Sequence, residues 1–150
     1  MSDPRLSRAL IDWIGARVPA VAGKVFPLGA RPGTPAPFVT YAQISRVPVT
    51  YFGGLSGLTK RRVQVDVWDT DQERGADIAF KICGRKADPG LDQFSGAMAY
   101  GAIAGFAAGS LAVQHIRASA EPEEFVDPTD GSETGWTRFG CDYFIHYIEG

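Results

Sequence analysis

The sequence predicts an α+β fold, with one mixed or mainly antiparallel four-stranded sheet and two helices packed on one of its faces, in the order α-β-β-α-β-β. Two segments carry apolar residues at helical spacing, and four others alternate apolar and polar residues as strands do. Long connections rich in Gly and Pro separate these segments. The 150 residues fit a single domain, residues 1–150, that is large enough to bury a core.

The first element is predicted to be an amphipathic helix at the N-terminus. Asp3 suits the N-cap position, Pro4 suits the first turn, and Pro19 ends the pattern. A single apolar stripe means that the helix lies on another element, most simply a sheet. The stripe consists of Leu6, Leu10, Trp13, Ile14 and Val18.

Two strands are expected next. Residues 26–37 are rich in Pro and Gly and predict a loop, whereas Pro37–Ser45 alternates as a strand does. Arg46–Thr59 is predicted to be a connection, too long for a tight hairpin turn. The clearest strand is Lys60–Trp68, where valines at every second position predict a half-buried face.

The second helix is expected to begin at a capping box. In Thr70-Asp71-Gln72-Glu73 the Thr70 side chain can accept from the amide of Glu73, while Glu73 reaches back. The segment Asp88-Pro89-Gly90 closes the element. Its apolar face consists of Ala76, Ala79, Phe80 and Cys83, widened by Ile78 and Ile82.

The C-terminal part is predicted to supply the last two strands. Gln93–Gln114 has no formal charge and is rich in Gly and Ala, which favours a loop or a loosely packed helix over a membrane span. Leu111–Ala118 and Trp136–Ile148 are predicted strands, joined by an acidic loop. Both borders of such a sheet would remain open in a monomer, which is a liability unless something pairs with them.

Composition excludes several classes of function. The net charge of −2 lacks the basic excess that a protein gripping nucleic acid by its backbone carries. Two distant cysteines, Cys83 and Cys141, form neither a disulfide framework nor a zinc pattern. The start of the chain does not resemble a signal peptide, so we expect a cytoplasmic location and no membrane partner.

One dense group of carboxylates deserves a test as a metal site, namely Asp66, Asp69, Asp71 and Glu73. A metal-dependent nuclease needs carboxylates that converge on one point. Helix capping explains most of this group, and an acid-x-Lys pair is missing. His115 and His146 show no metal-ligand spacing, and both cysteines fall on apolar faces. We therefore expect no catalytic residue, metal or cofactor, although a small metal-dependent nuclease or hydrolase stays open as an alternative.

The order of these segments resembles a known family. After the N-terminal helix, Pro37-Phe38-Val39-Thr40-Tyr41 opens a strand, a Gly-rich loop follows, and Gly57-Leu58-Thr59 leads into Arg62-Val63-Gln64-Val65-Asp66-Val67-Trp68 and an Ala-rich helix. This arrangement, from about Leu6 to Asp88, is similar to that of the tail terminator, or tail-completion and tail-to-head joining, proteins of long-tailed bacteriophages.

The resemblance implies a structural virion protein. Members form six-fold rings that cap the growing tail tube, stop its polymerisation and offer a docking surface to the head connector. The implied partners are further copies of the chain, the tail tube protein and the head-completion or connector protein, with DNA only passing through the channel. The implied place is the head-proximal end of the virion tail, after assembly in the host cytoplasm. A neck or head-completion adaptor and a soluble ligand-binding domain are the remaining alternatives.

Given the resemblance, two segments are candidate surfaces. The connection before the second strand combines aromatic anchors with basic partners, which suits a subunit or tube interface, although an ordinary hairpin folded onto the core is the alternative. Its candidate residues are Tyr51, Phe52, Leu55, Lys60, Arg61 and Arg62. The acidic loop could face the channel and let DNA pass, or could simply be a solvated loop. Its candidate residues are Glu121, Glu123, Glu124, Asp127, Asp130 and Glu133.

Overall fold

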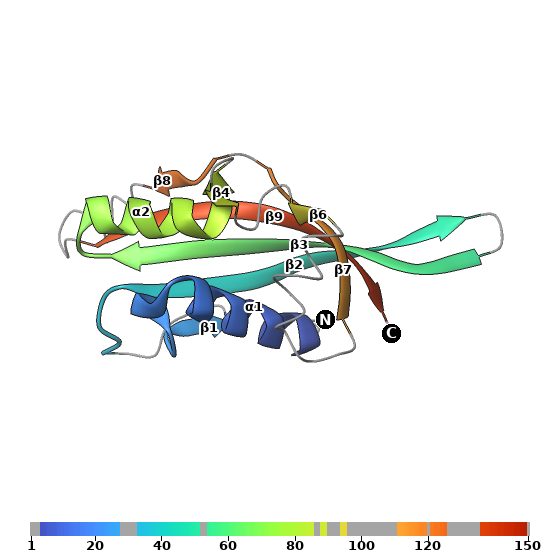
Figure 1. Cartoon of the computed structure of the whole chain (residues 1–150), viewed down its shortest axis with the longest axis horizontal. Helices are drawn as coiled ribbons and strands as arrows, with labels where there is room; N and C mark the ends of the chain where they lie inside the picture. The colour runs from blue at the N-terminus through green and yellow to red at the C-terminus, as the bar shows by residue number, and fades with distance from the viewer. Residues whose placement is uncertain are drawn as a thin grey trace.

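The computed structural model describes residues 4–27, 33–51, 54–85, 88–89, 94–95, 111–119, 121–125 and 136–149 (Figure 1). Among the predicted interface and channel residues, Phe52, Asp127, Asp130 and Glu133 lie outside these ranges, as does the predicted cap Asp3. The helices are α1 (Pro4–Arg17), the 3-10 helix η1 (Pro19–Val21) and α2 (Gln72–Cys83). The strands are β1 (Val25–Pro27), β2 (Phe38–Tyr51), β3 (Gly54–Asp69), β4 (Gly84–Arg85), β5 (Asp88–Pro89), β6 (Phe94–Ser95), β7 (Leu111–Ala118), β8 (Glu123–Phe125) and β9 (Thr137–Glu149).

A mixed sheet forms the body of the protein, so the predicted α+β class is confirmed. Its strands run in the order β1-β2-β3-β9-β7-β6, with β8 paired to β9, and β4 and β5 form a separate two-stranded sheet. β1 runs parallel to β2, whereas the other pairs are antiparallel. The predicted count of four strands and the predicted order are wrong. The sequence pattern did not reveal the strands of two or three residues, which are β1, β4, β5, β6 and β8. Such strands are too short to show an alternation.

β2 and β3 form one long hairpin, and here the structure overturns a prediction. The segment Arg46–Thr59, expected to be a loop, is mostly strand, since Tyr51 pairs with Gly54 and Pro48 pairs with Thr59. Gly54 and Gly57, part of the Gly-rich run behind that prediction, lie within β3. β2 carries register shifts between Gln43 and Ser45 and between Pro48 and Thr50, which are the places where β-bulges relieve the ladder.

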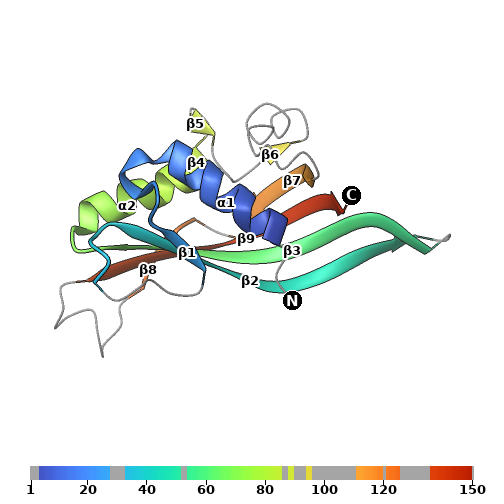
Figure 2. The same ribbon diagram turned by 90° about the horizontal axis from the view of Figure 1, so that it is seen from below.

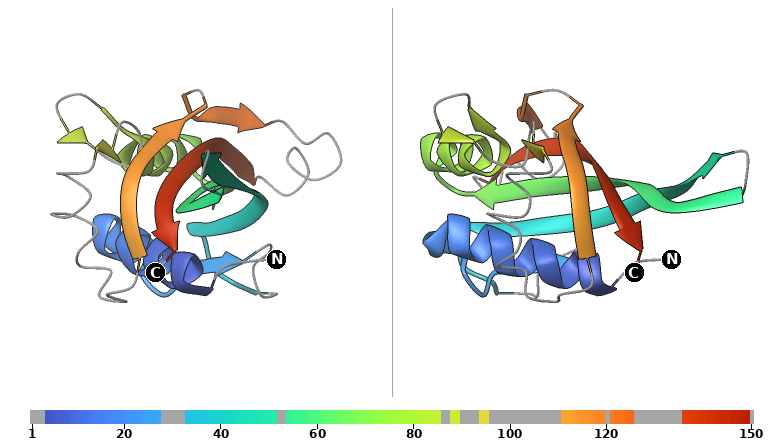
Figure 3. Two further views of the ribbon diagram at one scale, coloured as in Figure 1. Left: turned by 90° about the vertical axis from the view of Figure 1, so that its right-hand side faces the viewer. Right: turned by 45° about the vertical axis from the view of Figure 1, so that its right-hand side comes forward.

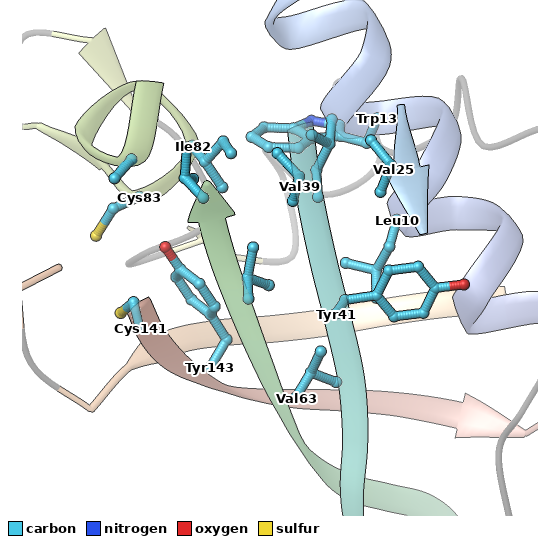
Figure 4. Packing of buried hydrophobic residues seen from close by; sticks show 14 of the residues in the cluster. Leu10, Trp13, Val25, Val39, Tyr41, Val63, Ile82, Cys83, Cys141 and Tyr143 are labelled. Carbon is cyan, nitrogen blue, oxygen red and sulfur yellow. The ribbon is translucent and has the colours of Figure 1, made fainter. Parts of the chain in front are cut away.

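Both α-helices cover the same face of the sheet, as predicted, and neither described helix covers the opposite face, which we call the open face (Figure 2). Alternation along β3 explains this arrangement, because Val63, Val65 and Val67 are buried under the helices while the residues between them point to the open face. The core is completed by apolar side chains from both helices and from β2 and β9 (Figure 4). These include Leu10, Trp13, Val39, Tyr41, Ile82 and Tyr143.

β7 and β8 act as one interrupted strand along the same border of β9. Ala118 pairs with Tyr143 and Glu123 pairs with Gly140. The residues between Ala118 and Glu123 therefore interrupt the pairing opposite only two residues of β9, Cys141 and Asp142. The amide of Ser119 still donates to the carbonyl of Asp142, at 2.9 Å. The strand therefore bends with the strong twist of the sheet, which Figure 3 shows from the side.

The second helix begins one residue later than the capping box predicted. Asp71, not Thr70, is the N-cap, and its side chain accepts from the amide of Arg74 at 3.1 Å. The helix ends at Cys83 because Gly84 adopts a positive φ of 93°, a conformation that suits glycine. Arg85 belongs to β4, so the helix ends well before the predicted closing segment Asp88-Pro89-Gly90.

Candidate assembly surfaces

The distal part of the β2–β3 hairpin extends beyond the body of the sheet (Figures 1 and 3). We call residues 47–59 the arm. β9 accompanies β3 only as far as Leu58, which pairs with Ile148, so from Gly54 to Gly57 β3 pairs only with β2 among the described strands. The arm includes the predicted interface residues Tyr51 and Leu55 on its two strands.

The composition of the arm is that of a contact surface. Residues 47–59 contain no charged side chain and hold Val47, Val49, Tyr51, Leu55 and Leu58. The cores of protein interfaces are depleted in charged residues. An uncharged hairpin that extends from its own sheet is therefore a candidate contact surface.

Among the described strands, β1 alone pairs with the outer border of β2, and only at the start of the strand. β1 pairs with Val39, with Thr40 and with Tyr41, and no other described strand pairs with β2 on that side from Ala42 onward. Ile44, at the first register shift, is the exposed large apolar residue of the described chain, at 46%. Bulges and Pro48 are devices that discourage indiscriminate pairing at an edge. This border could therefore pair with a strand of matching shape, while the bulges and Pro48 disfavour unlimited strand-to-strand aggregation.

The predicted basic cluster is divided between the two faces of β3. Arg61 lies on the helix-covered face, is only 4% exposed, and donates from Nε to the hydroxyl of Tyr147 at 3.1 Å. Lys60 and Arg62 lie on the open face. Because Arg61 is occupied inside the subunit, only its two neighbours can contact a partner without disturbing the core.

Lys60 and Arg62 are held by β9 on the open face. The Nζ of Lys60 lies 4.8 Å from the ring centroid of Phe144, a cation–π geometry. Arg62 forms an ion pair with Asp142, with Nε donating to Oδ2 at 3.0 Å. These exposed contacts orient the two cations rather than contribute much to stability.

An aromatic patch, which we define as Phe38, Trp68 and Trp136, covers the opposite end of the open face. The rings of Phe38 and Trp68 stack with centroids 6.2 Å apart, and Trp136 tilts against Phe38 at 5.4 Å. All three side chains are partly exposed. Trp68 donates from Nε1 to the hydroxyl of Thr40 at 3.0 Å, which fixes its ring.

Arg138 and Asp66 border the aromatic patch. The guanidinium of Arg138 lies 5.6 Å from the Trp68 ring centroid, and its Nε lies 3.3 Å from Oδ1 of Asp66. Burial raises the pKa of Asp66 although Arg138 and Gln64 act in the opposite direction. Sequence reasoning missed this patch as a surface because Phe38 and Trp68 come from distant segments. Their position on the polar face of alternating strands was the signal that could have found it.

The acidic segment is in part a strand. Glu123 and Glu124 belong to β8, and Glu121 lies in the bend before it; all three side chains are exposed. Glu124 accepts from Nε2 of Gln72 at 2.7 Å, which ties β8 to the start of α2. The described acidic side chains therefore form a solvent-facing rim at the end of the molecule away from the arm (Figure 1).

The candidate metal carboxylates do not converge. Asp66 points to the open face, whereas Asp69 is fully buried on the opposite face, where it accepts from Nε and Nη2 of Arg74 at 2.7 Å and 2.6 Å. Burial would raise the pKa of Asp69, but the hydrogen bonds from Arg74 and from the amide of Asp71 outweigh it and lower the pKa. The part of the chain that the structure describes holds no group of three His, Cys, Asp or Glu side chains able to bind a metal.

Both cysteines lie in the core beside a tyrosine. The hydroxyl of Tyr143 points between the thiols of Cys83 and Cys141 (Figure 4), and burial raises the pKa of this tyrosine well above its ordinary value. The nearby void between α2 and the sheet has room for no more than a water molecule. This cluster therefore packs the core and offers no space for a substrate. The two histidines lie opposite each other in the backbone register of β7 and β9.

Within the described ranges, no helix is both long enough and apolar enough to span a bilayer. The sequence matches no protein-family model and no curated protein.

Proposed function

We propose that this protein is a ring-forming tail terminator of a long-tailed bacteriophage. The ring caps the tail tube, stops its polymerisation and presents a docking surface to the head connector. The role is structural and requires no catalytic residue. The resemblance of residues 6–88 to that family supplies the biological setting, and the shape of the molecule supports it.

The observation that carries the proposal is the arm. The backbone of this hairpin extends from its own sheet and its sequence carries no charge, a composition that suits contact with another subunit. Copies of the same chain are the simplest partner, because contacts between two different patches close into a ring when the rotation between neighbours closes. The open border of β2 supplies further backbone groups that a neighbour could pair with.

In such a ring the two flat sides differ, and this difference would stop growth. One side has to imitate the tube subunit, while the other must not offer the next tube-binding surface. Many equivalent weak contacts acting together would supply the affinity for the tube end. The acidic rim of Glu121, Glu123 and Glu124 suits a channel wall, since negative charge lets DNA pass without adhering.

Light scattering after gel filtration, combined with negative-stain images, tests the proposal. We expect a discrete cyclic oligomer, either free or on the ends of purified tail tubes. Addition of the protein to polymerising tube subunits should shorten the tubes in proportion to its concentration. A protein that stays monomeric, leaves tube length unchanged and does not bind tube ends would contradict the proposal. Binding to head connectors but not to tubes would instead favour a neck adaptor.

A further inference from the structure

We propose that the arm of one subunit docks on the aromatic patch of the next subunit. The inference rests on the proposed function, since it specifies which two surfaces meet in the ring. It concerns one contact: the uncharged hairpin of residues 47–59 against the rings of Phe38, Trp68 and Trp136.

The two surfaces cannot meet within one chain. Phe38 begins β2 and Tyr51 ends it, so the 14 residues of this strand separate the patch from the tip of the arm. At about 3.3 Å per residue the separation is roughly 40 Å. Figure 1 shows the arm at one end of the sheet and the start of β9, which leads in from Trp136, at the other. A contact between them therefore requires two copies.

The two surfaces match in chemistry. The arm brings aliphatic and aromatic residues and Pro48 without any formal charge, so it needs an acceptor that is itself apolar. Among the residues whose side chains are described, the patch brings three aromatic rings into contact on the open face, whose middle is occupied by the ion pair of Arg62 with Asp142 and by Lys60 over Phe144. Clustered aromatic rings are the typical anchors of protein interfaces.

The patch is also ordered before a partner arrives. The hydrogen bond from Trp68 to Thr40 and the guanidinium of Arg138 over its ring hold the tryptophan in place. A preformed acceptor loses little conformational entropy on binding, which leaves more of the contact energy for affinity. The same geometry makes the contact head to tail, because donor and acceptor are different surfaces. A contact of this type propagates from copy to copy until the ring closes.

Mixing two defective variants tests the contact. The arm variant V49D/L55D places charge on the donor and keeps the patch, while the patch variant F38A/W136A keeps the arm. Each variant alone should remain monomeric. Together they should form a 1:1 dimer, because one intact arm and one intact patch meet once and the chain of contacts then stops. Phe144→Ala, which removes an aromatic ring from the same face but outside the patch, is the matched control and should assemble as the parent does.

A second measurement does not depend on the folding of the patch variant. In protein labelled with 5-fluorotryptophan, the fluorine signals of Trp68 and Trp136 should shift on assembly, while that of the buried Trp13 should not. The arm variant should abolish these shifts at the same protein concentration.

The outcomes separate this inference from the proposed function. If the parent protein forms rings but the patch variant does so equally well, or if the mixture yields no dimer, the arm docks elsewhere and the inference is wrong while the ring stands. If the parent never forms rings or caps tubes, yet the mixture gives the 1:1 dimer, the contact is correct and the terminator role is wrong.

Discussion

Asp69 is the carboxylate on which the junction of β3 and α2 depends. It is fully buried, and it joins the end of the strand to Arg74 and to the amide of Asp71. These donors hold its pKa below the ordinary value of 3.8. A carboxyl whose pKa is lower in the folded state stabilises the fold above its unfolded pKa, and that stability is lost as the pH falls through the folded value.

Asp69→Asn should therefore lower the free energy of unfolding at pH 7 by about 1.5–3 kcal/mol, the typical range for hydrogen bonds to a charged group. Below about pH 4 the parent loses the same contribution, so the two proteins should converge. Urea unfolding at pH 7 and at successively lower pH measures both effects. A loss that stays constant across this range would show that the charge of Asp69 is not responsible.

Asp66 provides a control on the opposite face of the same strand. Burial raises its pKa, so the folded protein binds its proton more tightly than the unfolded chain does. Stability then decreases as the pH rises through the unfolded and folded pKa values. Asp66→Asn should accordingly cause no loss at pH 7, with a change within about 0.5 kcal/mol or a small gain.

Arg61 and Arg62 are adjacent in sequence but differ in structural role. Arg61→Ala removes a buried side chain and leaves the hydroxyl of Tyr147 without that donor, so we expect a loss of about 2–4 kcal/mol. Arg62→Ala breaks an exposed ion pair and should cost no more than about 1 kcal/mol. Thermal and urea unfolding of both variants checks the contrast. Equal losses would show that β3 does not have the described register.

At the scale of the elements, α2 lies close against the sheet at Gly75. A Cβ added there would lie 3.1 Å from Cβ of Asp69 and 3.2 Å from a ring carbon of Phe139, closer than ordinary contact allows. At Gly15 in α1 the nearest atom would be 3.6 Å away, which is an ordinary distance. Replacing each glycine with alanine therefore distinguishes the effect of helix propensity, which both positions share, from the effect of packing, which differs between them.

Gly15→Ala should stabilise the protein by about 0.5–1 kcal/mol, because alanine reduces the freedom of the unfolded chain and favours helix. Gly75→Ala gains the same propensity but forces Asp69 or Phe139 to move, so we expect a net loss of about 1–3 kcal/mol. Calorimetric unfolding of both variants measures the difference. Stabilisation by both changes would mean that α2 does not lie against Phe139 in this way.

The elements also show what sequence reasoning could and could not reach. β7 was predicted at its observed bounds, and β9 nearly so, because alternation over eight or more residues is an unambiguous signal. β1 and β8 contain three residues each and depend on the strands beside them for their conformation. Arg46–Thr59 was predicted to be a connection because it contains a Gly-rich run and is too long for a tight hairpin turn, whereas in the structure most of it pairs across the hairpin.

The candidate surfaces, like the strands, could be predicted only in part from the sequence, because some of their residues come together only through strand pairing. Aromatic and basic residues around the arm could be recognised as a group, but the position of Arg61 inside the subunit follows from strand alternation across the Gly-rich segment. The cap at Asp71 instead of Thr70 is a shift of one residue, within the ordinary uncertainty of helix ends. The aromatic patch required the pairing of β2 with β3, which no local pattern reveals.

At the scale of the whole molecule, the body and the arm are separable. The described core is built from α1, η1, α2, β1, β7 and parts of β2, β3 and β9. Among the described strands, β2 and β3 pair only with each other in the distal arm, from Gly54 to Gly57. Its removal should therefore leave the body folded, which makes assembly testable without loss of the native state.

The sharpest whole-molecule prediction is thus an arm deletion. Replacing residues 49–58 with Asn-Gly joins Pro48 to Thr59, which already pair in β2 and β3, and Asn-Gly suits a two-residue hairpin turn. The shortened protein should unfold within about 1 kcal/mol of the parent monomer, because the described core is unchanged. It should remain monomeric in light scattering and should not cap tubes. A shortened protein that still forms rings would show that the arm is dispensable and that the border of β2, with Ile44, carries assembly instead.

The proposed contact is apolar, so assembly of the parent protein should change little between low and high salt in light scattering. An ionic contact would instead weaken as salt screens it.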